Sequence, residues 1–155
     1  MSFLAALALL AVQDAPAPDR SQDMAYQSQQ MLALAKLNGA QGWNSTPEGL
    51  RWRRIRGDGS GKHPTVADTV TLHYAGTFID GETFDSSYDR GEPATFPLAR
   101  LIKGWQVAVP LMGVGDTFEV AIPANLGYGF EGKGPIPGGA TLLFRIELLD
   151  IPAAG

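Results

Sequence analysis

Three separated stretches of the chain alternate apolar and polar residues with a period of two, and this pattern limits the fold more than any other feature. Successive side chains of a β-strand point to opposite faces, so the period is typical of strands with one buried and one exposed face. Sheets built of such strands are largely antiparallel, because parallel sheets are usually buried on both faces. The apolar positions are Val70, Leu72, Tyr74 and Phe78 in the first stretch, Phe118, Val120 and Ile122 in the second, and Leu142, Phe144, Ile146 and Leu148 in the third.

A turn and one helix complete this half of the chain. Asp80-Gly81 lies between two strand-like runs and predicts a β-hairpin, since Asp-Gly favours tight hairpin turns. From Leu50 onward, only residues 100–109 have the composition of a helix, which Gly104 weakens and Pro110 restricts at its end. The sequence therefore predicts an α+β fold in which one antiparallel sheet packs against one short helix.

A second helix is predicted before the sheet, over residues 23–38. The segment is rich in Ala, Leu, Met, Gln and Lys, which favour helices, and Gly39 ends it. Two roles for this helix stay open: it is either an arm for dimerisation or docking, or a helix that lies on its own domain. In both cases its apolar side is expected to carry Met24, Met31, Leu34 and Ala35.

The N-terminal end carries ten consecutive apolar residues, 3–12, followed by small residues, Pro and Asp. This arrangement is typical of a secretory signal peptide. We assign the signal to residues 1–17, and a linker and the helix to residues 18–45. No Lys or Arg precedes the run, and no clean A-x-A cleavage site precedes Gln13. We therefore predict a periplasmic or secreted protein, or a cytoplasmic one if the apolar segment is retained. The run is too short for a membrane span, which needs ~18 residues.

Composition excludes several other classes of protein. The length of 155 residues predicts one domain with a short appendage. The 12 Lys and Arg against 16 Asp and Glu give a net charge of −4, whereas a general nucleic-acid binder is expected to be basic. Because the chain has no cysteine, disulfides, thiol nucleophiles and iron–sulfur clusters are excluded. With only His63 and His73 available, we predict no metal site.

Three apparent motifs are interpreted as structural. Residues 127–132 match G-x-G-x-x-G, but a dinucleotide site needs that loop to begin a helix, and Gly and Pro follow here. Residues 57–62 lack the spacing of a phosphate loop and predict a turn. A basic cluster around Trp52 is expected to form the solvated side of a first strand, and not a nucleic-acid patch; it consists of Arg51, Arg53, Arg54 and Arg56.

The second half of the chain resembles a known family. Five segments follow the order and spacing of FKBP-type peptidyl-prolyl cis/trans isomerases: LHYAGTFIDGETFDSSYDRGEP at 72–93, LIKGW at 101–105, LMGVGD at 111–116, NLGYG at 125–129 and IPGGATLLFRIELLDI at 136–151. With its predicted helix and signal, the chain is similar to exported bacterial members with a helical N-terminal segment. The resemblance implies a five- or six-stranded antiparallel sheet wrapped around one short helix, with the domain over residues 46–152 and the active site between helix and sheet.

The same resemblance implies the roles of individual residues. The backbone N–H of Ile102 and the hydroxyl of Tyr128 would donate hydrogen bonds to substrate carbonyls. Asp85 would place its carboxylate beside the carbonyl that rotates, with Tyr74 or Arg90 holding it in position. The proline ring would lie on Trp105, within walls formed by Phe84, Phe96, Leu101, Ile136 and Phe144.

The implied function is to accelerate the rotation of X–Pro bonds in folding proteins. That rotation crosses a barrier of ~18–20 kcal/mol and breaks no bond, so we expect neither a nucleophile nor a cofactor. The implied partners are proline-containing polypeptides, and macrolide inhibitors of the family are further candidate ligands. An alternative from another class is a chaperone or partner-binding module that keeps the pocket while its catalysis is incidental.

Two positions depart from the family pattern. Ala94 stands where the family often has an aromatic residue, and the loop between Tyr128 and Ala140 is one residue shorter.

A covalent mechanism would have to use Asp85 or a neighbouring serine, Ser86 or Ser87, and no histidine stands close to them in sequence. His73 alternates with inward-pointing residues and is therefore expected to be exposed.

Overall fold

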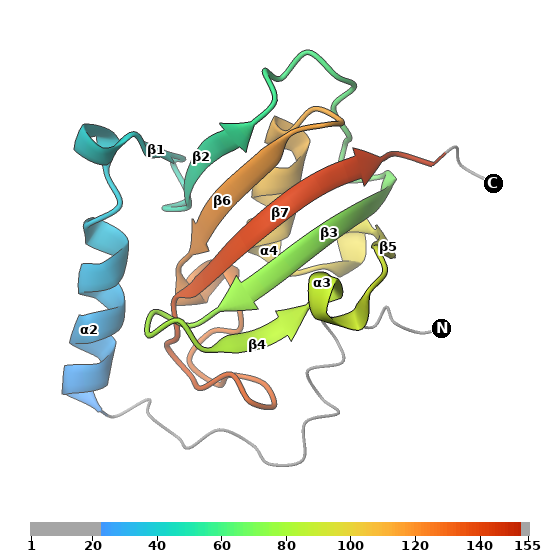
Figure 1. Cartoon of the computed structure of the whole chain (residues 1–155). Coiled ribbons are helices and arrows are strands. Elements are labelled where there is room, and N and C mark those ends of the chain that lie inside the picture. Colours follow the sequence, from blue (N-terminus) through green and yellow to red (C-terminus); the bar gives the residue numbers. More distant parts are fainter. Residues whose placement is uncertain (1–22, 153–155) are drawn as a thin grey trace.

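The computed structural model describes residues 23–152, so the predicted signal peptide at 1–17 lies outside the described residues. This part of the chain forms an antiparallel sheet in the order β1-β2-β6-β7-β3-β4, and β5 also pairs with β3 (Figure 1). The sheet has seven strands where five or six were expected, because a two-residue strand, β1, adds to its edge. The strands are β1 (Asn44–Ser45), β2 (Arg51–Arg56), β3 (Thr69–Thr77), β4 (Thr83–Ser86), β5 (Ala94–Pro97), β6 (Thr117–Ile122) and β7 (Leu142–Asp150).

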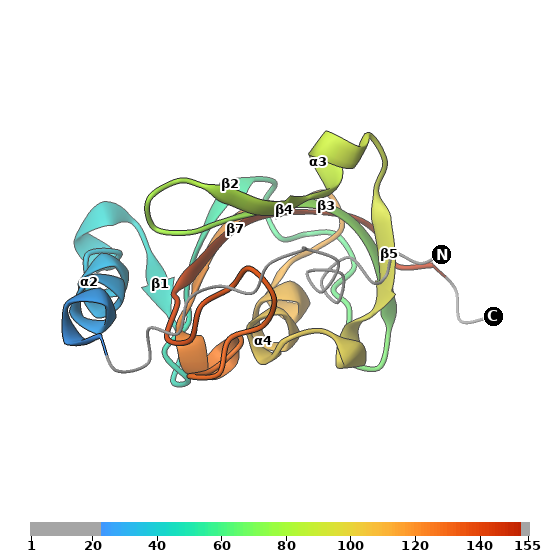
Figure 2. The same ribbon diagram turned by 90° about the horizontal axis from the view of Figure 1, so that it is seen from below.

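The sheet curves around the short helix α4 (Lys103–Ala108), which packs on its inner face (Figure 2). The alternating residues of β3, β6 and β7 point toward this helix and form the core: Leu72, Tyr74, Phe118, Val120, Phe144 and Ile146 are at most 2% exposed. This arrangement confirms the α+β fold and the inward face that the period-two pattern predicts. The helix is flanked by 3₁₀ turns at Leu98–Arg100 and Val109–Leu111, and Pro110 lies in the second of them.

The predicted hairpin joins β3 to β4. The N–H of Phe78 donates to the carbonyl of Glu82 at 2.9 Å, and Gly81 takes a φ of 91° in the turn. The Asp-Gly prediction is confirmed, although the connection is longer than the two-residue turn that the dipeptide favours.

The neighbour of β3 changes in the middle of this strand. Up to Leu72 the strand pairs with β5, and from Ala75 onward it pairs with β4. Between them, the buried hydroxyl of Ser87 accepts a hydrogen bond from the Tyr74 N–H (2.7 Å) and lies 3.2 Å from the Tyr74 carbonyl. Ser87 begins the one-turn helix α3 (Ser87–Arg90), which the sequence analysis did not predict.

His73 is half-buried, so the prediction of an exposed position is wrong. Its Nδ1 lies 2.8 Å from the Ser87 hydroxyl, and its ring stacks on Tyr88 with the ring centres 4.6 Å apart. The side chain points to the outer face of the sheet as the alternation requires, but α3 covers it there. Because His73 and Ser87 lie far apart in the sequence, the sequence analysis did not predict their contact.

The predicted N-terminal helix is α2 (Met24–Ala35), and it is followed by a 3₁₀ turn at Gly39–Gln41. The methionines of its apolar side do not pack on the domain: Met24 and Met31 are 80% and 71% exposed, and the one buried residue of the helix is Gln30. The helix is oriented by two hydrogen bonds that Thr141, just before β7, donates to Gln30, and not by its methionines. It lies beside the sheet of its own domain (Figure 2).

The basic cluster on β2 is less solvated than predicted. Arg53 pairs with Glu119 of β6 at 2.7 Å, and Arg51 donates to the Leu37 carbonyl at 2.8 Å. Arg54 pairs with the buried carboxylate of Asp116 at 3.3 Å. These contacts join β2 to β6 and to the chain that follows α2, so the cluster has a structural role.

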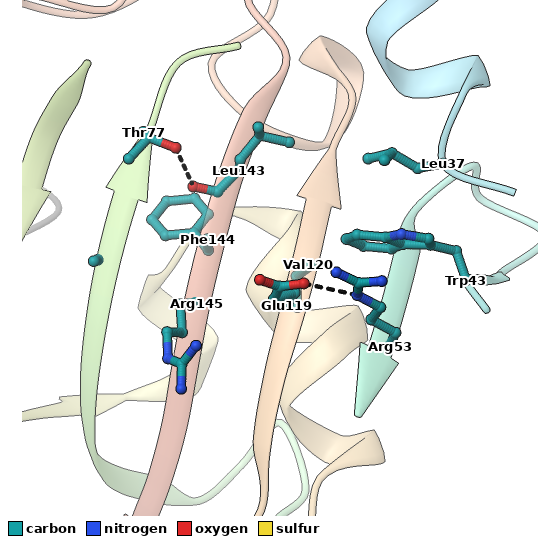
Figure 3. A pocket seen from close by; sticks show the side chains of 10 residues that line it. Leu37, Trp43, Arg53, Thr77, Glu119, Val120, Leu143, Phe144 and Arg145 are labelled. Carbon is teal, nitrogen blue, oxygen red and sulfur yellow. Dashed lines mark hydrogen bonds and ion pairs between the residues drawn. The ribbon is translucent and has the colours of Figure 1, made fainter. Parts of the chain in front are cut away.

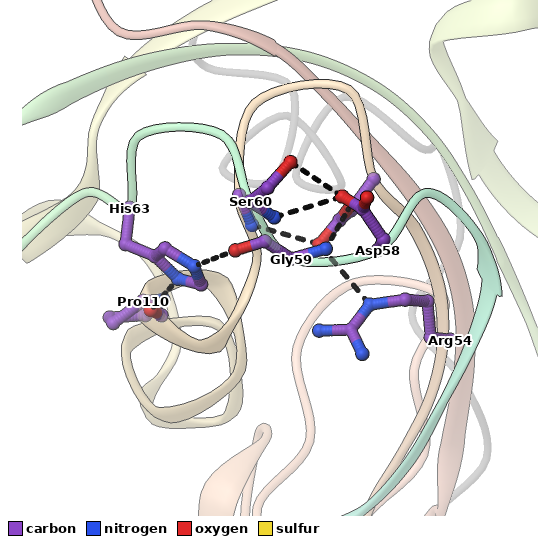
Figure 4. A network of polar contacts seen from close by, with 8 residues as sticks. Arg54, Asp58, Gly59, Ser60, His63 and Pro110 are labelled. Atoms are coloured by element: carbon purple, nitrogen blue, oxygen red, sulfur yellow. Dashed lines mark hydrogen bonds and ion pairs between the residues drawn. The ribbon is translucent and has the colours of Figure 1, made fainter.

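Asp116 also holds residues 57–62, where we predicted a turn. The carboxylate accepts from the N–H groups of Gly59 (3.2 Å) and Gly113 (3.0 Å). Within the turn, Asp58 accepts from Ser60, and Nε2 of His63 lies 2.8 Å from the Gly59 carbonyl (Figure 4). Among residues 23–152, no helix has both the length and the apolar character needed to cross a membrane.

Candidate active site

Five aromatic side chains meet between the sheet and α4. Trp105 of α4 lies at the centre: its ring is 5.2 Å from that of Tyr74 and 5.2 Å from that of Phe144, with both pairs edge-to-face. Phe96 of β5 lies 6.4 Å from Trp105, and Phe84 of β4 lies 5.6 Å from Phe144. The structure thus brings together aromatic residues that the resemblance assigned to one pocket.

The backbone makes room for these rings. A Cβ atom on Gly76 of β3 would lie 2.6 Å from the ring of Phe84 and 2.7 Å from the ring of Phe144, which is closer than van der Waals contact. The absence of a side chain at this position therefore allows the two rings to meet over β3. Trp105, in turn, is fully buried.

The indole N–H of Trp105 has no hydrogen-bond partner among residues 23–152. A buried donor without a partner costs about 1–3 kcal/mol, and such groups are rare in folded proteins. The helix therefore keeps an unsatisfied polar atom in the middle of the aromatic cluster.

One ionic group lies beside the aromatic rings. The Tyr74 hydroxyl donates to Oδ2 of Asp85 at 2.6 Å, and Arg90 donates to Oδ1 of Asp85 at 2.5 Å. A second nitrogen of Arg90 lies 2.8 Å from the Tyr74 oxygen, so the three groups form a closed network. The resemblance left open whether Tyr74 or Arg90 holds Asp85, and in the structure both contact it. The Asp85 side chain is only 8% exposed.

The two tyrosines near this carboxylate are held in the protonated form. Burial raises the pKa of the Tyr74 hydroxyl, and the hydrogen bond to Asp85 and its negative charge raise it further. Burial also raises the pKa of the Tyr128 hydroxyl, with a further contribution from the charge of Asp85. Both hydroxyls are therefore proton donors over the whole physiological range of pH.

The other predicted site residues lie on the connections around this cluster. Leu101 and Ile102 are half-buried just before α4, and the Ile102 N–H has no hydrogen-bond acceptor among the described residues. Tyr128 follows the 3₁₀ turn at Ala124–Leu126, and Ile136 is buried farther along the same loop. All four pack on the same hydrophobic core as the aromatic rings.

The loop at 127–132 begins no helix, in agreement with our rejection of a dinucleotide motif. It turns back at Lys133–Ile136, where each of these two residues donates its N–H to the other's carbonyl at 2.9 Å. Its glycines therefore belong to a loop beside the aromatic cluster.

Sequence reasoning missed two contributors to this region. Phe78 packs on Phe84 with ring centres 4.9 Å apart, and Ser87 supports the backbone of Tyr74. Phe78 directly follows β3 and belongs to the first alternating stretch of the sequence, which gave a signal for it. No sequence signal existed for Ser87, because its contact depends on the change of strand partner at Tyr74.

A hollow of about 360 Å³ lies on the outer face of the sheet, away from α4 (Figure 3). Leu37 and Trp43 of the N-terminal segment form one wall, and Leu143 lies across from them. Arg53 at its edge is paired with Glu119 and stacked on Trp43, 4.8 Å from the ring centre. This hollow holds none of the predicted catalytic groups.

Comparison with known proteins identifies the family. The model of the FKBP-type peptidyl-prolyl cis-trans isomerase domain matches residues 60–149. The chain is 49% identical over 126 residues to the FKBP-type isomerase FkpA of Aeromonas hydrophila, covering 80% of this chain and 46% of that protein. It is 49% identical over 112 residues to the 22 kDa FKBP-type isomerase of Escherichia coli (72% and 54% covered), and 45% identical over 109 residues to the outer membrane protein MIP of Legionella longbeachae (70% and 46% covered).

Solved structures agree with this result. The crystal structure of FkpA from Escherichia coli superposes with a TM-score of 0.78 at 36% identity, covering 83% of this chain and 60% of that one. A peptidyl-prolyl cis-trans isomerase from Pseudomonas syringae gives a TM-score of 0.76 at 28% identity, covering 90% and 98%. The chain spans about half the length of the curated relatives that it matches, 46% and 54% for the first two. By sequence and by fold, this chain belongs to the FKBP-type peptidyl-prolyl cis-trans isomerase family.

Proposed function

We propose that the protein is a peptidyl-prolyl cis-trans isomerase whose substrates are proline-containing segments of folding polypeptides. The observation that carries this proposal is the Tyr74–Asp85–Arg90 network, which fixes one negative charge at the side of a buried aromatic cluster. Family membership and the match of residues 60–149 to the isomerase domain support it.

The chemistry follows from the amide bond itself. A planar X–Pro amide is stabilised by resonance, and rotation crosses a barrier of ~18–20 kcal/mol. Twisting removes the resonance and lowers the dipole of the carbonyl, so the twisted amide loses less hydration than the planar one when it enters a dry pocket. A pocket of aromatic rings therefore stabilises the transition state relative to the ground state.

Individual residues take the following roles in this proposal. Trp105 lies under the proline ring, and Asp85 lies beside the carbonyl that rotates. The N–H of Ile102 and the hydroxyl of Tyr128 donate to substrate carbonyls and fix the peptide on either side of the twisting bond. Their positions support these roles, since Ile102 keeps a free N–H among the described residues and Tyr128 stays protonated.

No covalent step is needed. His73 lies 2.8 Å from Ser87 and forms the histidine–serine pair that a nucleophile would require. However, Ser87 is fully buried, and its hydroxyl is engaged by the N–H of Tyr74. We therefore assign Ser87 a structural role.

We further propose that the protein acts outside the cytoplasm, in the periplasm or after secretion. The apolar run at residues 3–12 supports this location, as does a relative that is named an outer membrane protein. The substrates would then be exported polypeptides. Macrolide inhibitors of the family are proposed as further ligands, on the basis of the family alone.

A second candidate function is that of a chaperone for unfolded chains. The observation in its favour is the outer side of α2, where Met24, Met31 and Leu32 are 80%, 71% and 60% exposed. Apolar side chains that a folded domain leaves exposed are suited to bind apolar segments of other chains. This activity would be independent of the aromatic cluster.

A protease-coupled assay on short peptides that differ in the residue before proline tests the first function. We expect isomerisation to be much faster than the uncatalysed reaction, which takes tens to hundreds of seconds. Suppression of aggregation of an unfolded protein, compared between the wild type and a Met24→Ser/Met31→Ser variant, tests the second. A protein that suppresses aggregation but leaves peptide isomerisation at the uncatalysed rate would support the chaperone and refute the isomerase.

A further inference from the structure

The loop that carries Tyr128 and Ile136 is tied to the N-terminal helix. The strand ladder between β6 and β7 ends at the pair Ile122–Leu142, so the N–H of Thr141 has no strand partner. It donates instead to Oε1 of Gln30, at 2.8 Å, and the Thr141 hydroxyl donates to the Gln30 carbonyl at 3.1 Å. Gln30 is 5% exposed and is the one buried residue of α2.

A second glutamine of α2 touches the loop one helical turn earlier. Nε2 of Gln27 lies 3.4 Å from the carbonyl of Gly138. A Cβ atom on Gly139 would lie 2.2 Å from Nε2 of Gln27, so the amide rests directly on the backbone at this glycine. Gln27 and Gln30 are neighbours on one helix face, because residues three apart lie one above the other.

The part of the loop that α2 contacts, residues 138–141, packs against the part that carries Tyr128, residues 128–130. The N–H of Gly139 donates to the carbonyl of Gly129 at 2.9 Å, and a Cβ on Gly138 would lie 1.8 Å from the carbonyl oxygen of Phe130. These two parts of the loop are therefore in direct backbone contact. A movement of residues 138–141 away from α2 must displace the backbone next to Tyr128.

We propose that Gln27 and Gln30 are positioning residues of the active site, which hold the loop 127–141 so that Tyr128 and Ile136 face the substrate. This inference rests on the proposed isomerase function. It gives the helix a role in the site of its own domain, in addition to any role in docking. Neither glutamine touches the substrate in this account, and both act through the loop.

The arrangement predicts a specific kinetic effect. When the helix contacts are removed, a smaller fraction of the molecules has the loop in its ordered, binding-competent conformation. The apparent Kd for substrate rises in proportion as this fraction falls. One to two neutral hydrogen bonds correspond to about a threefold to tenfold change in such an equilibrium. The effect should fall on KM, while kcat changes less than twofold, because Asp85 and Trp105 lie outside the loop.

The test uses the full chain with Gln30→Ala and the double variant Gln27→Ala/Gln30→Ala. Gln29→Ala, an exposed glutamine on the same helix, is the matched control, and Gln30→Glu keeps the acceptor oxygen for the Thr141 N–H. KM and kcat are measured on X–Pro peptides. Amide hydrogen exchange is measured at Gly132, Gly139 and Thr141, with the amides of β3 and β6 as internal references.

We expect KM to rise about threefold to tenfold in the alanine variants, with faster exchange in the loop alone and recovery in Gln30→Glu. Unchanged KM and loop exchange, equal to those of Gln29→Ala, would overturn the inference. So would a uniform acceleration of exchange throughout the sheet, because that is the result of a merely structural contact. Should Gln30→Ala fail to fold, Thr141→Val removes the hydroxyl donor to Gln30, and Thr141→Ser retains it. A wild type inactive on peptides would refute the proposed function, while the exchange data would still decide whether α2 orders the loop.

Discussion

The hydroxyl of Tyr74 on β3 donates a 2.6 Å hydrogen bond to the carboxylate of Asp85 on β4, so a core tyrosine binds the anionic group directly. The register explains it, because Gly76 pairs with Asp85 and Tyr74 stands two residues farther along the same face. Arg90 contacts both partners and neutralises the carboxylate. The Asp85 carboxylate is therefore held in one position beside the aromatic rings.

Removal of this charge tests its role in catalysis. Asp85→Asn keeps the shape of the side chain, and Asp85→Ala removes it. We expect kcat/KM on an X–Pro peptide to fall about tenfold to hundredfold in both, which corresponds to ~1.4–2.7 kcal/mol of transition-state stabilisation. Some activity should remain, because the aromatic walls still exclude water. Asp89→Asn, an exposed aspartate of α3, is the control. Wild-type kinetics in Asp85→Asn would contradict the assigned role.

Trp105 is best probed by a change that preserves the fold. Trp105→Ala would open a cavity in the core, at a cost of ~3–5 kcal/mol in the free energy of unfolding. Trp105→Leu remains apolar and also removes the unpaired indole N–H, but it loses the flat surface under the proline ring. We expect a fall in kcat/KM of about tenfold in a folded Trp105→Leu protein. Trp43→Leu, on the far face of the sheet, should leave kcat/KM unchanged. Equal kinetics in the two leucine variants would show that Trp105 is only a core residue.

Chelation tests the chemistry in another way. Rotation about an amide bond transfers no atoms, so it needs no Lewis acid, and no three His, Cys, Asp or Glu side chains come together within residues 23–152. We expect dialysis against EDTA, followed by the peptide assay, to leave kcat/KM unchanged. The control is readdition of Mg²⁺, Ca²⁺ and Zn²⁺ to the dialysed protein. Activity that is lost on chelation and returns with one metal would contradict the mechanism.

The strands were predictable because one face of each is buried and the other is not. Val70, Leu72 and Tyr74 all point inward, as their spacing requires. The same reasoning failed for α2, where the methionines are exposed and Gln30 is buried. A hydrophobic pattern predicts which side of an element is buried only when apolar contact orients it. Here hydrogen bonds of Gln27 and Gln30 orient the helix, and polar residues leave no hydrophobic signal.

The candidate site was accessible from the sequence only in part. Alternation places Tyr74 and Phe144 inward, but it cannot separate a core position from a pocket position, and the resemblance supplied that assignment. The contact between His73 and Ser87 was not accessible, since it depends on where β3 exchanges β5 for β4. The helix α3 was missed because four residues are too few to show a period.

Ser87 distinguishes a structural from a covalent role. Ser87→Ala leaves the N–H of Tyr74 buried without its partner, which should lower the free energy of unfolding by about 1–3 kcal/mol. The isomerase activity per folded molecule should stay largely intact. Urea denaturation and the peptide assay measure the two quantities on the same sample, with the exposed Ser45→Ala as control. A folded Ser87→Ala protein without activity would indicate a nucleophile and contradict the desolvation mechanism.

The tyrosines make stability depend on pH in the alkaline range. An unfolded tyrosine has a pKa of about 10, and burial together with Asp85 raises the pKa of Tyr74 in the native state. Native Tyr74 therefore retains its proton after unfolded Tyr74 has lost it. Its contribution to stability is complete below pH ~10 and is lost as the pH rises toward the native pKa, at about 1.4 kcal/mol per pH unit.

Urea denaturation at intervals between about pH 9 and pH 11 measures this slope. In Tyr74→Phe, the fall of unfolding free energy per pH unit should be smaller by about 1.4 kcal/mol once the pH exceeds ~10, whatever the overall stability of the variant. Tyr128→Phe should show a reduction of the same sign, since burial and the charge of Asp85 also raise the pKa of Tyr128. The ultraviolet absorbance of the phenolate follows the ionisation directly and should rise for these residues only as the protein unfolds. Identical slopes in wild type and Tyr74→Phe would mean that Tyr74 ionises normally and that water reaches the contact with Asp85.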